Sequence, residues 1–433
     1  MAFALDENSA WRITTPDRPF LGIKVERALT LCSRGTGGAT KVLVLPDLHR
    51  QASPNNPSIE APPNSQSLAH RRHFFYPFQS AHARAPQRCD TVKSGPLKSV
   101  NLALQGGGAH GAFVWGVVDR LLEDGRLGIE AISATSAGAM NAVALVSGMA
   151  KGGSEAARKS LHDFWLEVSR TDLMYDVYSP LNQWIQALKL PPEYHPFHAA
   201  IHFLTHTLPP KVLNPLNFNP LKSLLLRLVD FEQLNRSPPA PELYLNATNI
   251  RTGKIKVFQT PNVSAETVLA SACLPPYFQA VEIDGEHYWD GGYLGNPAIF
   301  PLIYRRGAKD VVIVQVTAIR RNELPASAAD VLHRITEISF NSSLMREMRA
   351  VAFATRLIDN GELEDGKHSR MFIHWIGNDR LMSQLGTATQ FHPEWSLLCR
   401  LRDAGRETAS QWLEENFESI GSRSTVDVTE MFL

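Results

Sequence analysis

Two turns, one carrying a serine and one rich in glycine, hold the groups with which this sequence could do chemistry. Ser136 follows a short apolar run, residues 129–135, and precedes Ala137 and Gly138. A serine at a sharp turn from strand to helix has its hydroxyl raised above the sheet, and N–H groups of the helix point toward it. The glycine-rich turn at 106–111, one strand–helix unit earlier, could supply further N–H groups to an oxyanion. Together the two turns indicate acyl transfer.

A serine nucleophile needs a base, and the sequence offers two kinds. A late histidine supplies the base in Ser-His-Asp hydrolases, but no late histidine here lies in a clear loop after a strand. The late histidines are His287, His368, His374 and His392. Asp290, in the glycine turn 290–292 beyond an apolar stretch, is the stronger candidate. Burial would raise its pKa toward the range that suits a general base, although an Asp-Gly-Gly turn alone is most often structural.

Two other interpretations of the same region are weaker. Residues 106–111 fit the G-x-G-x-x-G pattern of a dinucleotide site, but such a fold needs an acidic residue at the end of the second strand. This sequence has Ala-Thr-Ser there, at 134–136. Residues 131–150 carry no charge and could cross a bilayer, yet they are rich in small residues and include Asn141. We therefore expect a small-residue helix packed inside a domain.

Composition narrows the class of protein. The chain has 433 residues, enough for one large domain or two to three ordinary ones, and is 44% hydrophobic and 20% charged, as in soluble globular proteins. Its 43 basic and 43 acidic residues balance, so no overall field favours nucleic acid. The four scattered cysteines form no C-x-x-C pair, which indicates a reducing compartment. Acidic residues Asp6 and Glu7 and no apolar run open the chain, so we expect no signal peptide and a cytoplasmic location.

The elements that must position the two turns follow an α/β pattern from residue 100 onward. Strand-like runs cover residues 100–105, 129–135, 243–248, 254–258 and 311–316. Helical periodicity fits residues 112–124, 137–150, 155–169, 220–229, 266–273, 328–359 and 393–418. Strands that alternate with helices predict a mostly parallel sheet that is covered on both faces.

The first 97 residues differ from the rest. Only residues 41–45 look like a strand, and the chain beyond them is rich in Pro, Asn, Ser, His and Arg. Between Arg50 and Lys98 there are seven basic residues and two acidic ones. Such a composition buries little apolar surface, so we predict a disordered extension that catalysis does not need. Its basic character could also hold a partner or an anionic membrane surface.

An apolar segment at 190–210 stands apart from the regular pattern. It contains one acidic residue, Glu193, and no Lys or Arg. Its histidines His198, His202 and His206 fall on one helical face, a spacing that could bind a metal. Because no cysteine lies nearby and that face carries no carboxylate, a packed helix or a lid over the active-site mouth is the better interpretation. The sequence leaves the choice between these two open.

Three motifs in a fixed order give the chain a family resemblance. They are Gly-Gly-Gly-Ala-His-Gly at 106–111, Ala-Thr-Ser-Ala-Gly at 134–138 and Asp-Gly-Gly at 290–292. Linking segments agree as well, at 219–220, 246–249, 252–253, 270–275, 337–344, 405–406 and 424–428. With these motifs the sequence resembles the patatin-like phospholipases, in their bacterial branch, over about residues 98–433.

The resemblance implies a fold and a site. The fold is a three-layer α/β/α arrangement with a mostly parallel central sheet, a core at 98–305 and a helical C-terminal extension of the same unit at 306–433. The site is a Ser–Asp dyad without histidine, in which Ser136 is the nucleophile and Asp290 the general base. The oxyanion hole would comprise Gly106, Gly107, Gly108 and Gly111, with the N–H groups of Gly107 and Gly108 as donors; Ala134 and Gly138 would shape the turn around the serine. The implied reaction is hydrolysis of a phospholipid or another lipid acyl ester through an acyl-enzyme, without metal or organic cofactor.

Two positions depart from the family pattern, and alternatives remain within it. Ala134 stands where the serine turn usually has its first glycine, and one added methyl group is tolerable there. His110 stands where the family commonly has Arg or Lys, which would replace a permanent charge near the oxyanion by a titratable one. A thioesterase or polyester depolymerase could use the same dyad, and a catalytically weak relative could bind lipid without turnover. The expected partner is a lipid or other acyl-ester substrate, with peripheral membrane contact left open and no nucleic acid.

Overall fold

The computed structural model describes residues 97–171, 208–236, 241–275, 277–305, 307–326, 328–363 and 370–432, together with four short strands nearer the N-terminus. The chain divides into two units, Met1–Pro86 and Gln87–Leu433. In the first unit, β1 (Phe3–Leu5) pairs antiparallel with β2 (Trp11–Ile13), and β3 (Ala28–Cys32) with β4 (Val42–Pro46). The predicted strand at 41–45 is confirmed as β4, whereas β1 to β3 were not predicted. Otherwise the predicted disorder of residues 1–97 falls outside the described residues.

In the second unit, the described part of the chain forms an eight-stranded sheet in the order β12-β11-β5-β6-β7-β10-β9, with β8 beside β7. Its strands are β5 (Lys98–Leu104), β6 (Leu127–Ala134), β7 (Glu242–Asn249), β8 (Ile255–Gln259), β9 (Val281–Ile283), β10 (Glu286–Asp290), β11 (Asp310–Val314) and β12 (Phe372–Ile376). The neighbours from β12 to β7 run parallel, and β8, β9 and β10 add antiparallel pairs. The parallel part confirms the predicted sheet, and the antiparallel edge makes it mixed.

Helices and short 3-10 turns connect these strands. The helices are α1 (Ala112–Asp124), α2 (Ala137–Arg170), α6 (Pro210–Leu213), α7 (Pro220–Leu228), α8 (Phe231–Asn235), α9 (Ala265–Ser271), α10 (Phe300–Tyr304), α11 (Ala328–Asp359), α12 (Asp379–Met382), α13 (Thr387–Phe391), α14 (Trp395–Asn416) and α15 (Val428–Phe432). The 3-10 turns are η1 (Gly108–Gly111), η2 (Gly291–Tyr293) and η3 (Phe417–Ser419). The two helices predicted at 137–150 and 155–169 are confirmed as the two halves of α2, which are separated by a kink at Gly152 and Gly153, where the backbone leaves helical geometry.

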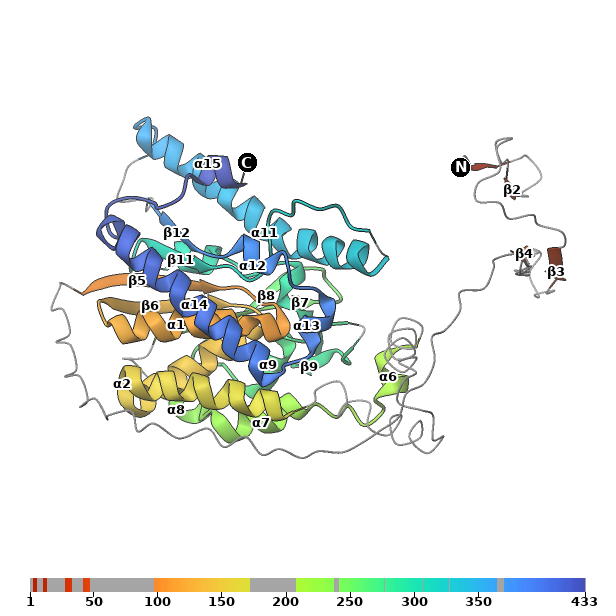
Figure 1. Cartoon of the computed structure of the whole chain (residues 1–433), viewed down its shortest axis with the longest axis horizontal. Coiled ribbons are helices and arrows are strands. Elements are labelled where there is room, and N and C mark those ends of the chain that lie inside the picture. The colour runs from red at the N-terminus through yellow and green to blue at the C-terminus, as the bar shows by residue number, and fades with distance from the viewer. Residues whose placement is uncertain are drawn as a thin grey trace, which may run out of the picture. The chain divides into compact units, whose positions relative to one another are not determined.

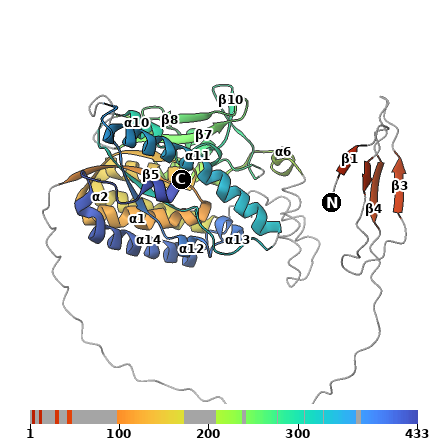
Figure 2. The same ribbon diagram turned by 90° about the horizontal axis from the view of Figure 1, so that it is seen from above.

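Alternate side chains of the central strands enter two different cores, because successive residues of a strand point to opposite faces. Leu102 and Leu104 of β5 pack into a core with α1, α2 and α14. Ala103, between them, belongs to a second core, in which Leu344 of α11 and Phe432 of α15 also lie. Figure 1 and Figure 2 show the resulting layers, with helices on both faces of the sheet. The predicted three-layer α/β/α fold with a helical C-terminal region is confirmed.

A close helix crossing ties the C-terminal region to the first helix of the core. A Cβ on Gly116 of α1 would overlap the backbone of Arg402 in α14, and one on Gly405 would overlap the carbonyl oxygen of Phe113. The two backbones therefore touch at this crossing, which only glycine permits. Arg406 adds an ion pair to Asp119 of α1. Since α1 continues directly from η1, the C-terminal region supports the glycine-rich turn.

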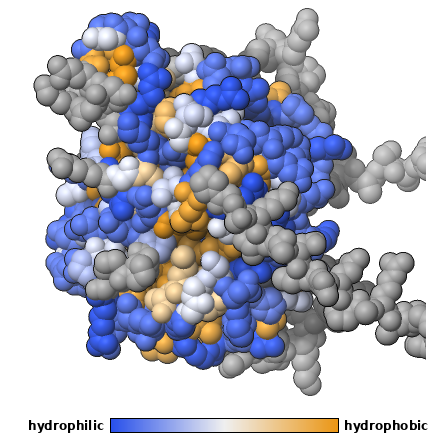
Figure 3. Space-filling view, turned by 90° about the vertical axis from the view of Figure 1, so that its left-hand side faces the viewer, coloured by the Kyte–Doolittle hydropathy of each residue, from blue (hydrophilic) through white to orange (hydrophobic). Residues whose placement is uncertain are grey.

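The structure also tests whether residues 131–150 could span a membrane. Among the described helices, none combines the length and the apolarity that a bilayer span requires. The uncharged stretch 131–150 instead forms the end of β6, the serine turn and the buried start of α2, as expected. Figure 3 shows one face of the molecule, which is largely hydrophilic with a band of hydrophobic side chains near its middle.

Candidate active site

The serine turn has the backbone geometry of a strained strand-to-helix junction. Ser136 lies between β6 and α2 with φ 57° and ψ −124°, a left-handed region that a residue with a side chain rarely occupies. Such strain persists only where the surroundings hold it, and it concentrates at functional sites. Here the Ser136 N–H donates to Oγ of Ser271, the last residue of α9, at 3.0 Å. The predicted placement of the serine at a sharp turn is therefore what the structure has.

Glycines let neighbouring backbones approach this turn. A Cβ on Gly106 would lie 2.5 Å from Cβ of Ser136, and one on Gly111 would lie 2.7 Å from Cβ of Ala137. A Cβ on Gly138 would lie 2.8 Å from the carbonyl oxygen of Gln105. These distances are shorter than real side chains allow, so each position requires glycine. Ala134 is fully buried at the end of β6, where its methyl group belongs to the main hydrophobic core and is accommodated.

Asp290 ends β10 and is completely buried. Its backbone is fixed on both sides, because its N–H donates to the carbonyl of Cys273 at 2.7 Å and its carbonyl accepts from the Thr248 hydroxyl at 2.8 Å. Its Oδ1 accepts the N–H of Gly292 at 2.7 Å. The Asp-Gly-Gly turn thus holds one carboxylate oxygen and leaves the other, Oδ2, for a different partner.

The Ser136 hydroxyl lies close enough to the Asp290 carboxylate to affect its pKa. Burial raises the pKa of Asp290 to about 7, while hydrogen bonds from the Gly292 N–H and the Ser136 hydroxyl act to lower it. Asp290 Oδ2 has no hydrogen-bond partner within the described part of the chain. The two side chains are therefore adjacent without a tight hydrogen bond, as is common in sites without substrate. A carboxyl group with a pKa near 7 can accept a proton at neutral pH.

The late histidines that sequence analysis considered take up other positions. His374 of β12 is buried and lies 2.8 Å from Oδ1 of Asp310, at the start of β11. His287 of β10 lies 3.8 Å from Glu282. His368 falls outside the described residues, and His392 follows α13 at the surface. Within the described ranges, no hydrogen bond joins a histidine to Ser136.

The glycine-rich turn has two free donors. Gly106, which was expected within the oxyanion hole, already donates its N–H to Oδ1 of Asn296 at 2.7 Å, so it cannot also bind an oxyanion. For the N–H groups of Gly107 and Gly108, no acceptor exists among the described residues. Gly111 contributes by its close approach to the serine turn. The expected set of four glycines therefore divides into two available donors and two residues that shape the turn.

His110 is neutral, contrary to the expectation of a titratable charge beside the oxyanion. Its ring is buried, and Nε2 lies 2.8 Å from Oγ1 of Thr389 in α13. Burial is the largest influence on its pKa, which falls to about 4. His110 therefore carries no charge across the neutral range, because a charged imidazole would lose its hydration there. Its role is to join η1 to α13.

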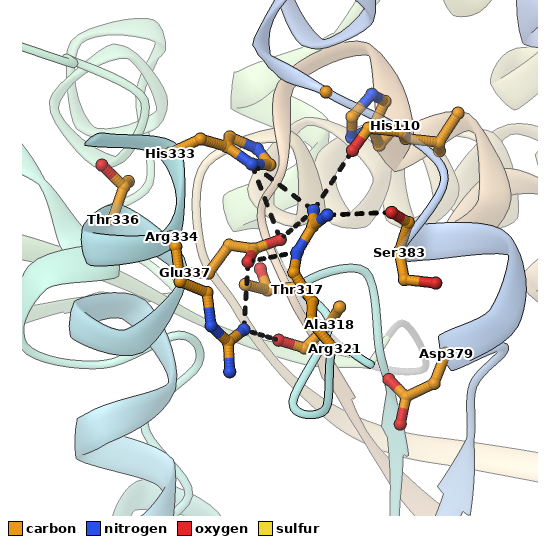
Figure 4. Close-up of polar contacts among 12 residues, drawn as sticks. His110, Thr317, Ala318, Arg321, His333, Arg334, Thr336, Glu337, Asp379 and Ser383 are labelled. Atoms are coloured by element: carbon orange, nitrogen blue, oxygen red, sulfur yellow. Dashed lines mark hydrogen bonds and ion pairs between the residues drawn. The ribbon is translucent and has the colours of Figure 1, made fainter. Parts of the chain in front are cut away.

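An ion cluster holds the segment around α13 beside His110 (Figure 4). Arg321 binds both carboxylate oxygens of the buried Glu337, at 2.8 and 2.7 Å, and Arg334 binds the same carboxylate at 3.0 Å. Arg321 also donates to the carbonyl oxygens of Ser383 and Leu385 at 2.8 and 3.2 Å. These two carbonyls come just before α13. The cluster therefore fixes the start of the segment that contains α13, which packs on η1.

An apolar pocket opens beside the serine. Besides Gly108 and Ser136, it is lined mainly by apolar side chains from α2, α7, α13 and the region after α9, including Met140, Phe164, Trp165, Leu274, Phe278 and Phe391. Such a lining suits a hydrocarbon chain. The segment 190–210, predicted as a lid or packed helix, and its three histidines lie almost wholly outside the described residues, so both interpretations stay predictions.

Sequence analysis missed several polar residues that hold the site. Gln105 and Thr317 follow the ends of the neighbouring strands β5 and β11, and Asn296 and Ser271 come from later segments. Polar residues just beyond the carboxyl ends of parallel strands are a usable signal, because these ends meet at one edge of the sheet.

Comparison with known proteins gives one family match and several similar solved structures. Residues 102–303 match the family model Patatin-like phospholipase. No protein among the curated sequences matches this chain. Among solved structures, VipD from Legionella pneumophila is similar at 18% identity and a TM-score of 0.33, over 74% of this chain and 67% of VipD. ExoU of Pseudomonas aeruginosa, solved with SpcU, is similar at 17% identity and a TM-score of 0.31, over 74% of this chain and 53% of ExoU, so the chain spans about half of ExoU's length.

Proposed function

We propose, from the premise that this chain carries a patatin-like phospholipase domain at residues 102–303, that it is a serine hydrolase of lipid acyl esters. Ser136 is the nucleophile and Asp290 the general base. The observation that carries the proposal is the pairing of a strained serine with a fully buried aspartate whose pKa is about 7. An aspartate of ordinary pKa would be a poor proton acceptor at neutral pH.

The reaction follows from these positions. Asp290 takes the proton of the Ser136 hydroxyl while Oγ attacks the acyl carbonyl, and the negative charge that develops on the carbonyl oxygen meets the N–H groups of Gly107 and Gly108. The C–O bond to the alcohol breaks, and the leaving oxygen receives the proton from Asp290. Water then attacks the acyl-enzyme, with Asp290 as base again, and releases the fatty acid and the free serine.

The pocket beside Ser136 supports a lipid substrate. Its apolar lining can bury an acyl chain, and burial of each CH₂ group contributes about 0.8 kcal/mol. Ser136 stands at the wall of this pocket, so a chain inside it would place its carboxyl carbon near Oγ. We include phospholipids among the candidate substrates because the family match supports lipid hydrolysis.

The test is an acyl-ester panel run on the protein and on Ser136→Ala. The panel contains phospholipids, glycerides, soluble esters of increasing chain length, an acyl thioester and a polyester. We expect hydrolysis of lipid esters that Ser136→Ala abolishes, and labelling of Ser136 by a fluorophosphonate. Ser147→Ala, a buried serine on α2 outside the site, is the matched control and should keep activity. Turnover that survives in Ser136→Ala would contradict the role of Ser136 as nucleophile. Turnover of the thioester or the polyester alone would show that lipid esters are not the substrates.

A further inference from the structure

We infer that Asn296 and Thr317 form a relay that aims the N–H of Gly107 at the oxyanion, which makes both of them positioning residues. The inference rests on the proposed function, because it concerns how the oxyanion donor of that reaction is held. Neither side chain has a contact with Ser136 or Asp290 among the hydrogen bonds described, so they act through the glycine-rich turn alone.

The relay is a closed ring of hydrogen bonds around one glycine. Asn296 is completely buried, and its Oδ1 accepts the N–H of Gly106 at 2.7 Å. Its Nδ2 donates to Oγ1 of Thr317 at 3.3 Å. The Thr317 hydroxyl donates in turn to the carbonyl oxygen of Gly106 at 3.4 Å. Both polar groups of Gly106 are therefore held, one by each residue of the relay.

The direction of the Gly107 N–H follows from the planarity of the peptide bond. The Gly106 carbonyl and the Gly107 N–H belong to the same peptide unit, and in a trans peptide they point in opposite directions. A hydroxyl that holds the carbonyl on one side therefore turns the N–H to the other side. Gly107 has no side chain to limit this rotation, so without the relay the peptide could turn and lose its aim. The Gly107 N–H is also one of the two donors of the turn that have no acceptor among the described residues.

The Thr317 hydroxyl can donate one hydrogen bond, and its contact with Asn296 determines to which acceptor it donates. Because Asn296 Nδ2 donates to Oγ1, the lone pair on that side is occupied and the proton is free for the Gly106 carbonyl. The Thr317 backbone is fixed as well, since its N–H and that of Val316 both donate to Oε1 of Gln105 at 2.9 Å. The end of β11 is thereby tied to the end of β5 just before the glycine-rich turn.

The test compares three variants on a soluble ester. Thr317→Val keeps the shape but removes the hydroxyl, and Thr317→Ser keeps the hydroxyl. Thr336→Val is the control: Thr336 of α11 lines a second, small cavity together with Gly107 and Thr317, and its hydroxyl donates to the carbonyl oxygen of Leu332 in its own helix. Loss of a whole oxyanion donor costs about 10²–10³ in kcat, so we expect Thr317→Val to lower kcat roughly 10- to 100-fold. We expect KM and Tm to stay close to wild type, Thr317→Ser to recover most of the rate, and Thr336→Val to be unaffected.

A second measurement distinguishes a change in the orientation of the Gly107 N–H from a general disturbance of the structure. A trifluoromethyl ketone adds to Ser136 and carries the oxyanion, so its inhibition constant should rise in Thr317→Val by the same factor as kcat/KM falls. Asn296→Asp, which keeps the acceptor for Gly106 but loses the donor to Thr317, should weaken the same inhibitor. Unchanged kcat and inhibition in Thr317→Val would overturn the relay while Ser136→Ala still upholds the hydrolase. A wild-type protein without ester hydrolysis would overturn both.

Discussion

Gly106 lies against the back of Ser136, so close that a Cβ on the glycine would stand 2.5 Å from Cβ of the serine and 3.3 Å from its hydroxyl oxygen. The glycine-rich turn and the serine turn are therefore packed directly against each other, so each limits the position of the other.

Gly106→Ala should therefore displace the serine. We expect kcat/KM on a soluble ester to fall by roughly 100-fold or more, since a displacement of about 1 Å at a catalytic group has that effect. Gly386→Ala is the matched control, because a Cβ there meets nothing within 4 Å. Equal activity of the two variants would show that the contact between turn and serine is not needed.

The pH–rate profile should follow Asp290. The base must be ionised, and its pKa is about 7, so the rate should rise with pH through 7 and fall roughly tenfold per unit below it. Its titratable neighbours Cys273 and Tyr293 have pKa values raised to about 12, so they add no second transition near neutrality. A profile that is flat between pH 5 and 8 would contradict the role of Asp290.

The same aspartate should weaken the fold at alkaline pH. Burial raises its pKa from 3.8 to about 7, so the folded state holds a proton that the unfolded chain releases above about pH 4. Stability from this group is full at low pH and is lost as the pH rises through 7. We expect Asp290→Asn to be inactive and, at pH 8, more stable than wild type by on the order of 2–4 kcal/mol in urea unfolding. The two proteins should converge near pH 4, and a variant that is less stable at pH 8 would refute this account.

His110 should have the opposite effect on the pH dependence of folding stability to that of Asp290. Its pKa falls from 6.5 to about 4 on folding, so between these values the unfolded chain binds a proton that the folded protein does not. Stability should therefore decline as the pH drops from 6.5 toward 4. In His110→Gln, thermal unfolding should depend less on pH in that window, and the pH–rate profile above pH 6 should keep its shape. A shifted profile would mean that His110 is charged in the working enzyme.

Removal of residues 1–95 should leave hydrolysis within about twofold of the full chain, since chain termini outside a domain contribute little to its stability. The second unit begins at Gln87, and its first strand is fixed near its start by Lys98, whose Nζ donates to the carbonyl of Phe417 at 2.9 Å. Specific activity and Tm of the truncated protein are the measurements. An insoluble or inactive product would show that the N-terminal part supports the domain.

Local patterns in the sequence were enough to predict several of the longer elements, including β6, which ends just before Ser136. The strands β5 and β6 and the helices α1 and α11 have clear apolar periodicity, and all four were predicted. Strands β9, β10 and β12 were not. Each has three to five residues, and β10 reads Glu-His-Tyr-Trp-Asp, without the alternation that marks a strand.

The support of the site was harder to predict because it comes from distant parts of the chain. Asn296 lies 190 residues from the glycine it binds, and Thr317 lies 211 residues from it. The charge state of His110 likewise depends on burial by α13 and its neighbours, which only the folded arrangement shows. Sequence motifs indicate the groups that we propose to react, whereas packing determines how these groups are oriented and protonated.

The crossing of α1 and α14 has a consequence for the order in which the site is completed. A ribosome makes Gly405 of α14 long after Gly116 of α1, so the outer face of α1, with Trp115, stays bare while the sheet assembles. Apolar groups that are exposed during synthesis are prone to aggregate until their partners have been made. The glycine-rich turn gains its last support only when α14 docks. The proposed hydrolysis should therefore begin only after α14 has been made and has packed on α1.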